Sequence, residues 1–503
     1  MSTGRTLPAF LFLSHEVCMT DTFRNFINGR WTAAASGATF QSINPADTRD
    51  VVGDFAASAA IDVRQAIGAA HDASPKWRNL SAWARGEILR KAADILESRL
   101  EEVARAMVRE NGKTIAEARG ETARGVALFR YYAAEGVRSV GDVVPSVSPR
   151  TMIYTTRVPL GVVSLVTPWN FPIAIPIWKL APALVYGNTV VLKPATAAPH
   201  CGVLVTKILE DAGIPPGVIN LVTGSGGEVG EELVRNDKVH GISFTGSNAV
   251  GHRIASWAAA RGMKFQLEMG GKNPVIVMPD CDVEQALTLT LRGAFGYAGQ
   301  KCTATSRAIV LDSLYDTFAA RLVERAASLK VGPGVDESSA VPPVVSGEQH
   351  RSILAAIERG KSEAKLLCGG GVPVGELYTK GFYIEPTIFG EVPAASFLAQ
   401  EEIFGPVLSL MRAKDLDEAI ALANGVRYGL SASIFTRDLN AVQEYCSRIE
   451  AGVVKVNGET AGLEPQVPFG GMKESSSHSR EQGRAAMEFF TSIKTVYLDR
   501  AGS

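Results

Sequence analysis

The chain has 503 residues, of which 46% are hydrophobic and 20% charged, and its formal net charge is −1. The length suits about three domains of roughly 150 residues each. The near-neutral charge argues against a nucleic-acid partner and a polybasic membrane-surface protein, and no apolar run reaches the roughly 20 residues of a membrane span. Six scattered cysteines without a C-x-x-C pair indicate a reduced, cytoplasmic protein, and no Cys/His cluster predicts a metal site.

The first clear periodic segment follows an ambiguous beginning. Residues 1–22 contain the short apolar run LPAFLFL without a convincing cleavage site, so we expect a disordered segment or a misassigned start before Met19. Apolar residues at three and four spacing then predict one amphipathic helix over 85–110, which Asn111 and Gly112 should end.

From residue 159 onward, short β-branched runs alternate with helical patterns. Runs such as GVVSLV, TVVLKP and VHGISFTG are the expected strands, and their alternation with helices predicts a parallel, doubly wound sheet. A second alternating series begins at NPVIVM and predicts a second α/β unit, with a helix over 282–298. The strand-like segments 142–158 and 487–500 lie outside both series, so we expect them to pair with each other or with another chain.

The turn TGSNAVG follows an expected strand, where ligands bind in open α/β sheets. Gly246 would let the backbone approach a ligand, and Ser247 could cap the next helix, whose N-terminus could hold a phosphate. The spacing from Gly246 to Gly251 is not the G-x-G-x-x-G fingerprint, so this motif alone favours an ordinary strand–turn–helix corner.

The segment TVVLKPATAAP lacks an acid where a Rossmann-type fold grips the adenosine ribose. Lys193 and Thr196 stand there, and no Asp or Glu comes before Glu210. Without a carboxylate to repel a 2′-phosphate, Lys193 could pair with one. We therefore expect NADP or NAD as cofactor, with a preference for NADP; the alternative is that Lys193 is a solvated surface lysine.

Three further residues are candidates for chemistry. Glu268 in LEMGGKNP is either a structural hydrogen-bonding group or a base with a raised pKa. Cys302 in YAGQKCTATSR is either a nucleophile or an inert buried thiol. Asn170 in TPWNFP either donates to a developing oxyanion or belongs to a rigid proline turn.

Seven motifs in order resemble those of the aldehyde dehydrogenase superfamily: TPWNFP, LKPA, FTGS, LEMGGKNP, GQKCTA, EEIFGPV and PFGGMK. The similarity runs from FINGRW at 26–31 to KTVY at 494–497. It implies an α/β fold with a Rossmann-type NAD(P)-binding domain, a second α/β catalytic domain and a small β oligomerisation arm, hence dimers or tetramers. The implied boundaries are 23–141 and 159–272 for the cofactor domain, 273–480 for the catalytic domain, and 142–158 and 487–500 for the arm.

The resemblance also implies roles for individual residues. Cys302 matches the nucleophile, and its thiol should be partly ionised at neutral pH. Glu268 matches the general base, and Asn170 matches the oxyanion donor, which acts together with the Cys302 amide. Lys179 matches a lysine near the thiol and the oxyanion asparagine. Aldehyde oxidation would then pass through a thiohemiacetal and a thioester that water cleaves. The residues implied to hold the cofactor are Thr167, Pro168, Trp169, Lys193, Thr196, Gly226, Gly230, Phe244, Thr245, Gly246, Ser247, Val250, Leu267, Gly270, Glu402 and Phe404.

Longer stretches, including ETARGVALFRYYAAEG and PFGGMKESSSHSREQG, are most similar to a bacterial branch that oxidises 2,5-dioxovalerate (α-ketoglutarate semialdehyde) to 2-oxoglutarate. Succinate semialdehyde is a weaker alternative, because that branch usually has Arg where this chain has Trp178; a broad or aromatic (vanillin-like) activity is another. The presence of both Cys302 and Glu268 disfavours a non-enzymatic binding protein. We expect the loop 458–467 to line the substrate mouth. His478 and Arg480 are candidate anchors for a distal carboxylate, and a structural salt bridge is the alternative for Arg480.

Overall fold

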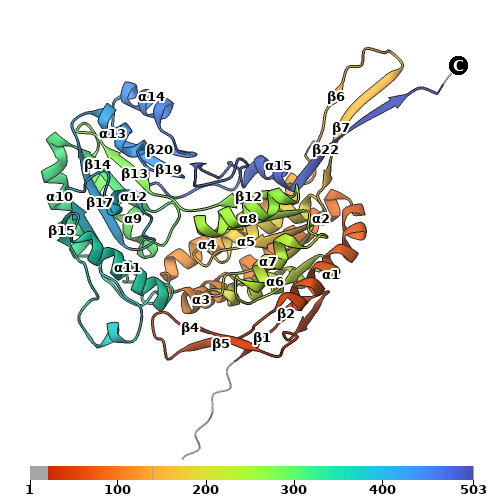
Figure 1. The fold of residues 1–503 in the computed structure, drawn as a ribbon, viewed down its shortest axis with the longest axis horizontal. Coiled ribbons are helices and arrows are strands. Elements are labelled where there is room, and N and C mark those ends of the chain that lie inside the picture. The colour runs from red at the N-terminus through yellow and green to blue at the C-terminus, as the bar shows by residue number, and fades with distance from the viewer. Residues whose placement is uncertain (1–20, 139, 502–503) are drawn as a thin grey trace, which may run out of the picture.

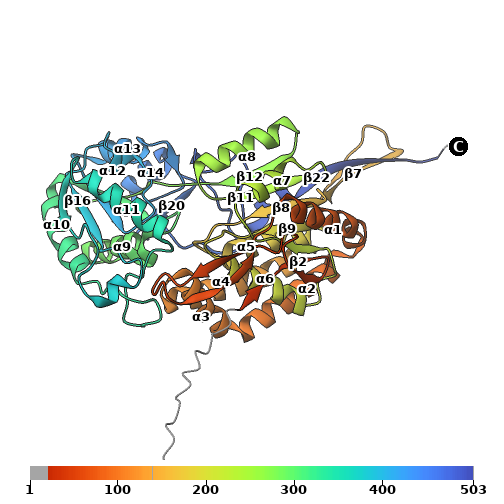
Figure 2. The same cartoon turned by 60° about the horizontal axis from the view of Figure 1, so that its bottom comes forward.

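The computed structural model describes residues 21–138 and 140–501, so residues 1–20, expected to be disordered or to precede the true start, lie outside the described part (Figure 1). Two seven-stranded sheets with flanking helices form the body, and a thin three-stranded sheet projects from it (Figures 1 and 2). The fold is α/β, as the alternating patterns predict.

The first large sheet has the order β12-β11-β8-β9-β10-β2-β3. Its parallel strands are β8 (Val162–Val166), β9 (Thr189–Lys193), β10 (Ile219–Leu221), β11 (Gly241–Thr245) and β12 (Lys264–Glu268). The chain leaves β8 to form β9 on one side and returns to form β11 on the other, which creates a topological switch point at β8. Two strands that the sequence patterns did not predict, β2 (Asn25–Ile27) and β3 (Arg30–Thr32), extend the β10 edge in antiparallel direction.

Helices cover both faces of this sheet. Successive residues of a strand, such as Val190 and Val191, belong to different core clusters, because neighbouring side chains in a strand point to opposite faces of the sheet. One cluster holds α1 (Ala60–Asn79), α7 (Glu228–Arg235) and α8 (Asn248–Ala260). The other holds α2 (Ala82–Ser98), α3 (Leu100–Asn111), α4 (Ile115–Glu135), α5 (Ala174–Val185) and α6 (Pro199–Asp211).

The single helix expected over 85–110 is wrong: the segment forms α2 and α3, which meet at Arg99. Arg99 leaves helical geometry (φ −106°, ψ 16°), and its N–H donates to Ile95 O. The next helix begins at Leu100, with Glu101 and Glu102 in its first turn. The apolar spacing continues across this break, so the pattern did not reveal it. Gly112 ends α3 in the left-handed region (φ 86°), as predicted.

The second large sheet has the order β15-β16-β17-β14-β13-β19-β20, with only β15 antiparallel. Its strands are β13 (Asn273–Val277), β14 (Thr305–Leu311), β15 (Lys365–Cys368), β16 (Thr387–Gly390), β17 (Val407–Ala413), β19 (Ser431–Phe435) and β20 (Val453–Val456). Its helices are α9 (Val283–Phe295), α10 (Asp312–Ala327), α11 (Gly347–Gly360), α12 (Phe397–Gln400), α13 (Leu416–Asn424) and α14 (Leu439–Arg448). The residue boundaries of the predicted domains stay a prediction.

The projecting sheet consists of β6 (Val143–Val144), β7 (Thr151–Pro159) and β22 (Thr491–Asp499), with α15 (Ala486–Phe490) at its base (Figure 1). β7 and β22 pair antiparallel from Thr151↔Asp499 to Thr491↔Pro159, so the two outlying segments pair with each other. We call this sheet the arm.

The remaining elements are short. They are the small sheet of β1 (Thr22–Phe23), β5 (Val51–Ala56) and β4 (Thr39–Ile43), the pair β18 (Tyr428–Gly429) and β21 (Met472–Lys473), and 3₁₀ turns at Gly296–Gly299, Glu376–Thr379 and Gly483–Ala485.

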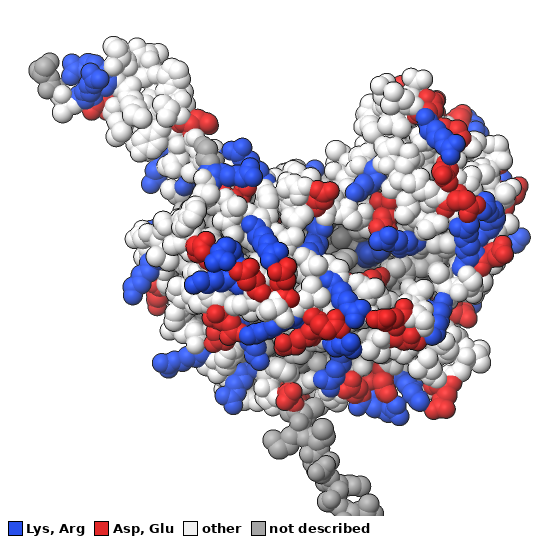
Figure 3. Space-filling view, turned by 180° about the vertical axis from the view of Figure 1, so that it is seen from behind, with Lys and Arg blue, Asp and Glu red and all other residues white. Residues whose placement is uncertain are grey.

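Charge is mixed over the molecular surface. Figure 3 shows acidic and basic side chains interspersed over one whole face, while the middle of the arm carries few of either. Within residues 21–138 and 140–501, no helix combines the length and the apolar character needed to cross a membrane.

Candidate active site

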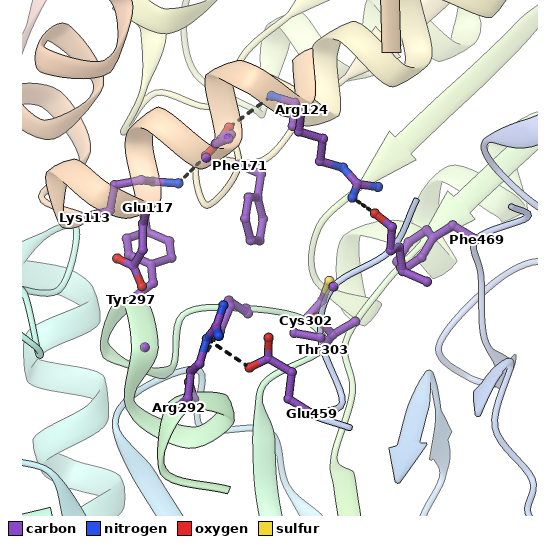
Figure 4. Close-up of a pocket in the computed structure, with 18 of the residues that line it drawn as sticks. Lys113, Glu117, Arg124, Phe171, Arg292, Tyr297, Cys302, Thr303, Glu459 and Phe469 are labelled. Carbon is purple, nitrogen blue, oxygen red and sulfur yellow. Dashed lines mark hydrogen bonds and ion pairs between the residues drawn. The ribbon is translucent and has the colours of Figure 1, made fainter. Parts of the chain in front are cut away.

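A cavity of about 390 Å³ lies beside Cys302 (Figure 4). Aromatic side chains form part of its wall: Phe171, Trp178, Tyr297 and Phe469. Glu459, Ala461, Gly462 and Leu463 also line it, so the loop 458–467 lies at this cavity as the sequence predicted.

Cys302 is held by an unusual turn and by the start of a buried strand. α9 ends at Phe295 rather than at the expected residue 298, because Tyr297 (φ 52°) and Ala298 (φ 49°) adopt left-handed geometry. Such backbone is costly for residues other than glycine and often accompanies functional sites. The carbonyl oxygen of Cys302 then accepts a hydrogen bond from Asn273 Nδ2 at 2.8 Å. A Cβ at position 271 would lie 2.6 Å from that oxygen, so glycine is needed there.

The Cys302 thiol is harder to ionise than the sequence suggested. Burial, followed by the negative charges of Glu402 and Glu268, raises the pKa of Cys302 to about 12. This direction disfavours free thiolate in the protein alone, and the partly ionised thiol stays a prediction. A nearby positive charge or a base is needed to form the nucleophile.

Asn170 occupies the turn between β8 and α5. Its Oδ1 accepts a hydrogen bond from the N–H of Phe171 at 3.1 Å, so the amide NH₂ is the part available for donation. Its backbone oxygen accepts a hydrogen bond from Lys113 Nζ at 2.9 Å. Asn170 is thus fixed from both its side chain and its backbone.

A buried ion pair between Lys113 and Glu121 supports this turn. Glu121 Oε1 also accepts the N–H groups of Ile173 at 2.9 Å and Ala174 at 3.0 Å, at the start of α5. A carboxylate is favourable at this positive helix end. Neither residue was predicted from the sequence, where the only available signal was that Glu121 falls on the buried side of a helical pattern.

Glu268 ends β12 and is 1% exposed. The Ser476 hydroxyl donates to its Oε2, whereas no described residue bonds to its Oε1. Burial, followed by repulsion from Glu481, raises the pKa of Glu268 well above its usual range. The carboxyl group is thus hydrogen-bonded and its pKa is raised, and its role as a base stays a prediction.

Lys179 does not line the cavity. It lies on α5 but pairs with the buried carboxylate of Glu481, and its Nζ also lies 2.7 Å from Ser243 Oγ. Glu481 therefore links Lys179 electrostatically to Glu268, a connection that the sequence analysis did not find. His478 is exposed, and Arg480 lies beside Glu268 without an ion pair to any described residue, so the salt-bridge alternative is wrong for Arg480. Neither residue lines the cavity.

The candidate cofactor residues gather where β9, β8 and β11 end, at the topological switch point. Thr167, Pro168 and Trp169 follow β8, Lys193 ends β9, and Thr245 ends β11. The hydroxyls of Thr167 and Thr245 are buried without a hydrogen-bond partner among the described residues. Buried hydroxyls normally have partners, so these two fit a polar ligand.

Lys193 is buried rather than solvated, with 4% exposure, so the surface-lysine alternative is wrong. Its Nζ donates to Pro194 O at 3.1 Å, and burial lowers its pKa to about 8. Thr196 is exposed nearby in sequence. Glu210 lies near the far end of α6, where its carboxylate accepts a hydrogen bond from Trp31 Nε1 at 2.9 Å.

The turn after β11 leads into α8. Ser247 holds the N-cap position, but its side chain makes no capping hydrogen bond, contrary to one sequence expectation. A Cβ on Gly246 would lie 2.5 Å from the Phe244 ring, and Val250 follows in the first turn of α8. Gly246 therefore lacks room for a side chain, and it lies in the turn just before the N-terminal N–H groups of α8.

Gly226 and Gly230, two other candidate cofactor residues, are not closely packed. Gly226 precedes α7 and Gly230 lies within it, and an added Cβ would meet no heavy atom within 4 Å at either position. Nothing in the packing requires glycine there.

Glu402 lies between α12 and β17 of the second large sheet, and it contacts the glycines that follow β12 of the first large sheet. Its Oε1 accepts the Gly271 N–H at 2.8 Å, and a Cβ at Gly270, three residues after buried Leu267, would lie 2.3 Å from its Oε2. Burial raises the pKa of Glu402 to about 7. Phe404, with φ 58°, packs edge-on against Trp169 at 5.3 Å between ring centroids.

Comparisons with known proteins agree with this architecture. Residues 31–496 match the model of the Aldehyde dehydrogenase family. The chain is 51% identical to the alpha-ketoglutaric semialdehyde dehydrogenase of Bacillus subtilis (strain 168) over 479 residues, which are 95% of this chain and 98% of that protein. It is 45% identical to the 2,5-dioxopentanoate dehydrogenase of Saccharolobus solfataricus over 466 residues, covering 92% and 96%. A crystal structure of betaine aldehyde dehydrogenase from Staphylococcus aureus in complex with NAD⁺ matches with a TM-score of 0.93 at 33% identity, covering 95% of each chain. The chain therefore belongs to the aldehyde dehydrogenase family.

Proposed function

We propose that this protein oxidises 2,5-dioxovalerate to 2-oxoglutarate with NAD(P)⁺. The observation that carries the proposal is the cavity beside Cys302, which combines a thiol with an excess of basic over acidic lining side chains. Such a cavity suits an aldehyde that also bears a carboxylate. The printed names of the relatives from Bacillus subtilis and Saccharolobus solfataricus support the same substrate.

In this proposal Cys302 attacks the aldehyde carbon. Glu268 takes the thiol proton and releases it to solvent, Sγ bonds to carbon, and the carbonyl oxygen becomes an alkoxide that the Asn170 amide and the Cys302 N–H stabilise. One such donor contributes about 3 kcal/mol in comparable oxyanion holes. Bound NAD(P)⁺ supplies the acceptor for the hydride. Glu268 then takes a proton from the water that cleaves the Cys302 thioester, which releases the acid and restores the thiol.

The residues at the ends of β8, β9 and β11 fit a dinucleotide. The two unpartnered threonine hydroxyls, the buried Lys193 and the uncapped start of α8 offer donors for ribose and phosphate groups. Glu402 would hold the second ribose, beside Phe404. We favour NADP over NAD because Lys193 has no competing carboxylate nearby in sequence; the Staphylococcus aureus relative was crystallised with NAD⁺.

We also propose that the protein is cytoplasmic and forms dimers or tetramers through the arm. The described cysteines are all unpaired, which suits a reducing compartment. Apolar side chains on the arm, including Met152, Ile493 and Leu498, are at least half exposed in the single chain. Such side chains suit burial against a second copy.

The aromatic wall of the cavity is the observation that favours a second candidate, a broad or aromatic aldehyde dehydrogenase. A panel of 2,5-dioxovalerate, succinate semialdehyde, pentanal and vanillin, each with NAD⁺ and NADP⁺, separates the candidates. We expect kcat/KM for 2,5-dioxovalerate to exceed the others by at least about 10-fold, a difference of about 1.4 kcal/mol. Equal values for vanillin and 2,5-dioxovalerate would contradict the proposal.

A further inference from the structure

The cavity beside Cys302 contains one basic side chain whose charge is not balanced locally. Four basic and three acidic side chains line the cavity. Lys113 pairs with Glu121, and Arg292 lies 3.6 Å from Glu459. Lys301 has no ion pair to a described carboxylate, but the charges of Glu117 and then Glu459 act favourably on it.

Arg124 is the basic residue left over. It projects from α4, is half-buried, and has no carboxylate within ion-pair distance among the residues described. Its Nη1 donates to Leu463 O and its Nη2 to Gln482 Oε1 at 2.8 Å, both of which are neutral acceptors. A guanidinium has five N–H donors, so donors remain for a ligand. Glu121 acts on Arg124 only through space, and Lys113 already occupies that carboxylate.

Two other buried arginines show how this fold usually compensates such a charge. Arg307 donates to Leu422 O and Ala423 O at the end of α13, and Arg85 donates to Val185 O at the end of α5. Carbonyls at a helix C-terminus carry partial negative charge, which balances a cation. Arg124 meets a loop carbonyl and an amide instead, so its charge calls for an anion that the chain does not provide.

The position of Arg124 is suited to a substrate. Figure 4 shows its side chain reaching from α4 toward Phe469, while the pair of Arg292 and Glu459 lies on another part of the wall and Cys302 is near Phe469. The guanidinium carbon also lies 5.9 Å from the centroid of the Trp178 ring, which holds it beside an apolar surface. Arg292 is less suited, since 71% of its side chain is exposed and Glu459 already neutralises it.

We propose that Arg124 anchors the distal carboxylate of the aldehyde substrate, in a bidentate pair, while Cys302 attacks the other end. The inference rests on the proposed oxidation of a carboxylate-bearing aldehyde. It adds that selectivity for such aldehydes comes from one arginine on α4. Arg480 and His478, which the sequence suggested for this role, do not line the cavity.

The test compares Arg124→Met and Arg124→Lys with the parent enzyme at saturating NADP⁺. The ratio of kcat/KM for 2,5-dioxovalerate to that for pentanal should fall about 100-fold in Arg124→Met, mainly through KM. Arg124→Lys keeps the positive charge but loses the planar guanidinium that binds both carboxylate oxygens. Its kcat/KM ratio should therefore lie between those of the parent enzyme and Arg124→Met. Arg130→Met is the matched control, because Arg130 lies on the same helix and pairs with Glu97 at the surface.

Competitive inhibition by glutarate against pentanal gives a second readout that does not depend on the proposed substrate. Its Ki should rise in Arg124→Met in parallel with the loss of selectivity. An unchanged ratio and Ki in Arg124→Met, or a greater loss in Arg292→Met, would overturn the anchor. If the parent enzyme itself fails to prefer 2,5-dioxovalerate, the proposed function fails, whereas the glutarate Ki still decides whether Arg124 binds a carboxylate.

Discussion

Two charged side chains at the site have pKa values that are shifted by burial. Burial raises the pKa of Glu402 to about 7 and lowers that of Lys193 to about 8. Both groups would therefore change charge close to physiological pH. The motifs identified these residues, but their burial depends on how β9 and the Glu402 loop pack, which is a tertiary property.

Lys193 yields a prediction about pH. Its protonated form predominates below about pH 8 and can pair with a 2′-phosphate, while its neutral form above that pH cannot. The Kd of NADP⁺ should therefore rise above pH 8, approaching about 10-fold per pH unit. NAD⁺ lacks that phosphate and serves as the matched control in fluorescence titrations. The same pH dependence for both nucleotides would exclude the proposed contact.

At the scale of elements, the turn before α5 depends on α4. The Lys113–Glu121 pair joins the start of α4 to the first N–H groups of α5 and to Asn170 O. Glu121→Ala leaves the buried Lys113 charge unpaired, so it should reduce the free energy of unfolding by about 3–5 kcal/mol. Urea unfolding measures this loss, and kcat should fall with it as Asn170 loses its support.

Two variants complete this test. Lys113→Met/Glu121→Leu removes both charges and should be less destabilised than Glu121→Ala. Arg130 lies on the same helix and forms exposed ion pairs with Asp94 and Glu97, so Arg130→Met should change stability by about 1 kcal/mol or less. A double variant less stable than Glu121→Ala would show that the unpaired Lys113 charge is not the main cause of the loss.

The sequence predicted the regular elements better than their interruptions. Alternating apolar runs located β8, β9, β11 and β13, because strand and helix periods differ. The break at Arg99 and the left-handed residues Tyr297 and Ala298 carry no local signal, since packing imposes them. The motifs likewise named Glu268 and Cys302, but not Glu121, Arg124 or Glu481, whose partners are distant in the chain.

At the scale of the whole molecule, we expect the protein to assemble into dimers or tetramers through the arm. Ile493 and Tyr497 are exposed and share one face of β22, so they offer apolar surface on a sheet that projects from the body (Figure 1). Ile493→Asp/Tyr497→Asp should lower the mass measured by light scattering to that of a smaller species, because charge would be placed in the interface. Asp499→Asn, near the exposed end of β22, is the control. An unchanged mass in the double variant would place the interface elsewhere.

The proposed reaction depends on a covalent bond to Cys302, and trapping the acyl-enzyme tests this bond most directly. Glu268→Gln should be mixed with 2,5-dioxovalerate and NADP⁺, quenched in acid and mapped by peptide mass spectrometry. Because thioester hydrolysis lacks its base, a 2-oxoglutaryl group should accumulate on Cys302 alongside a stoichiometric burst of NADPH, and Cys302→Ala should show neither. A burst of NADPH without an adduct on Cys302, or an adduct on another cysteine, would contradict the account.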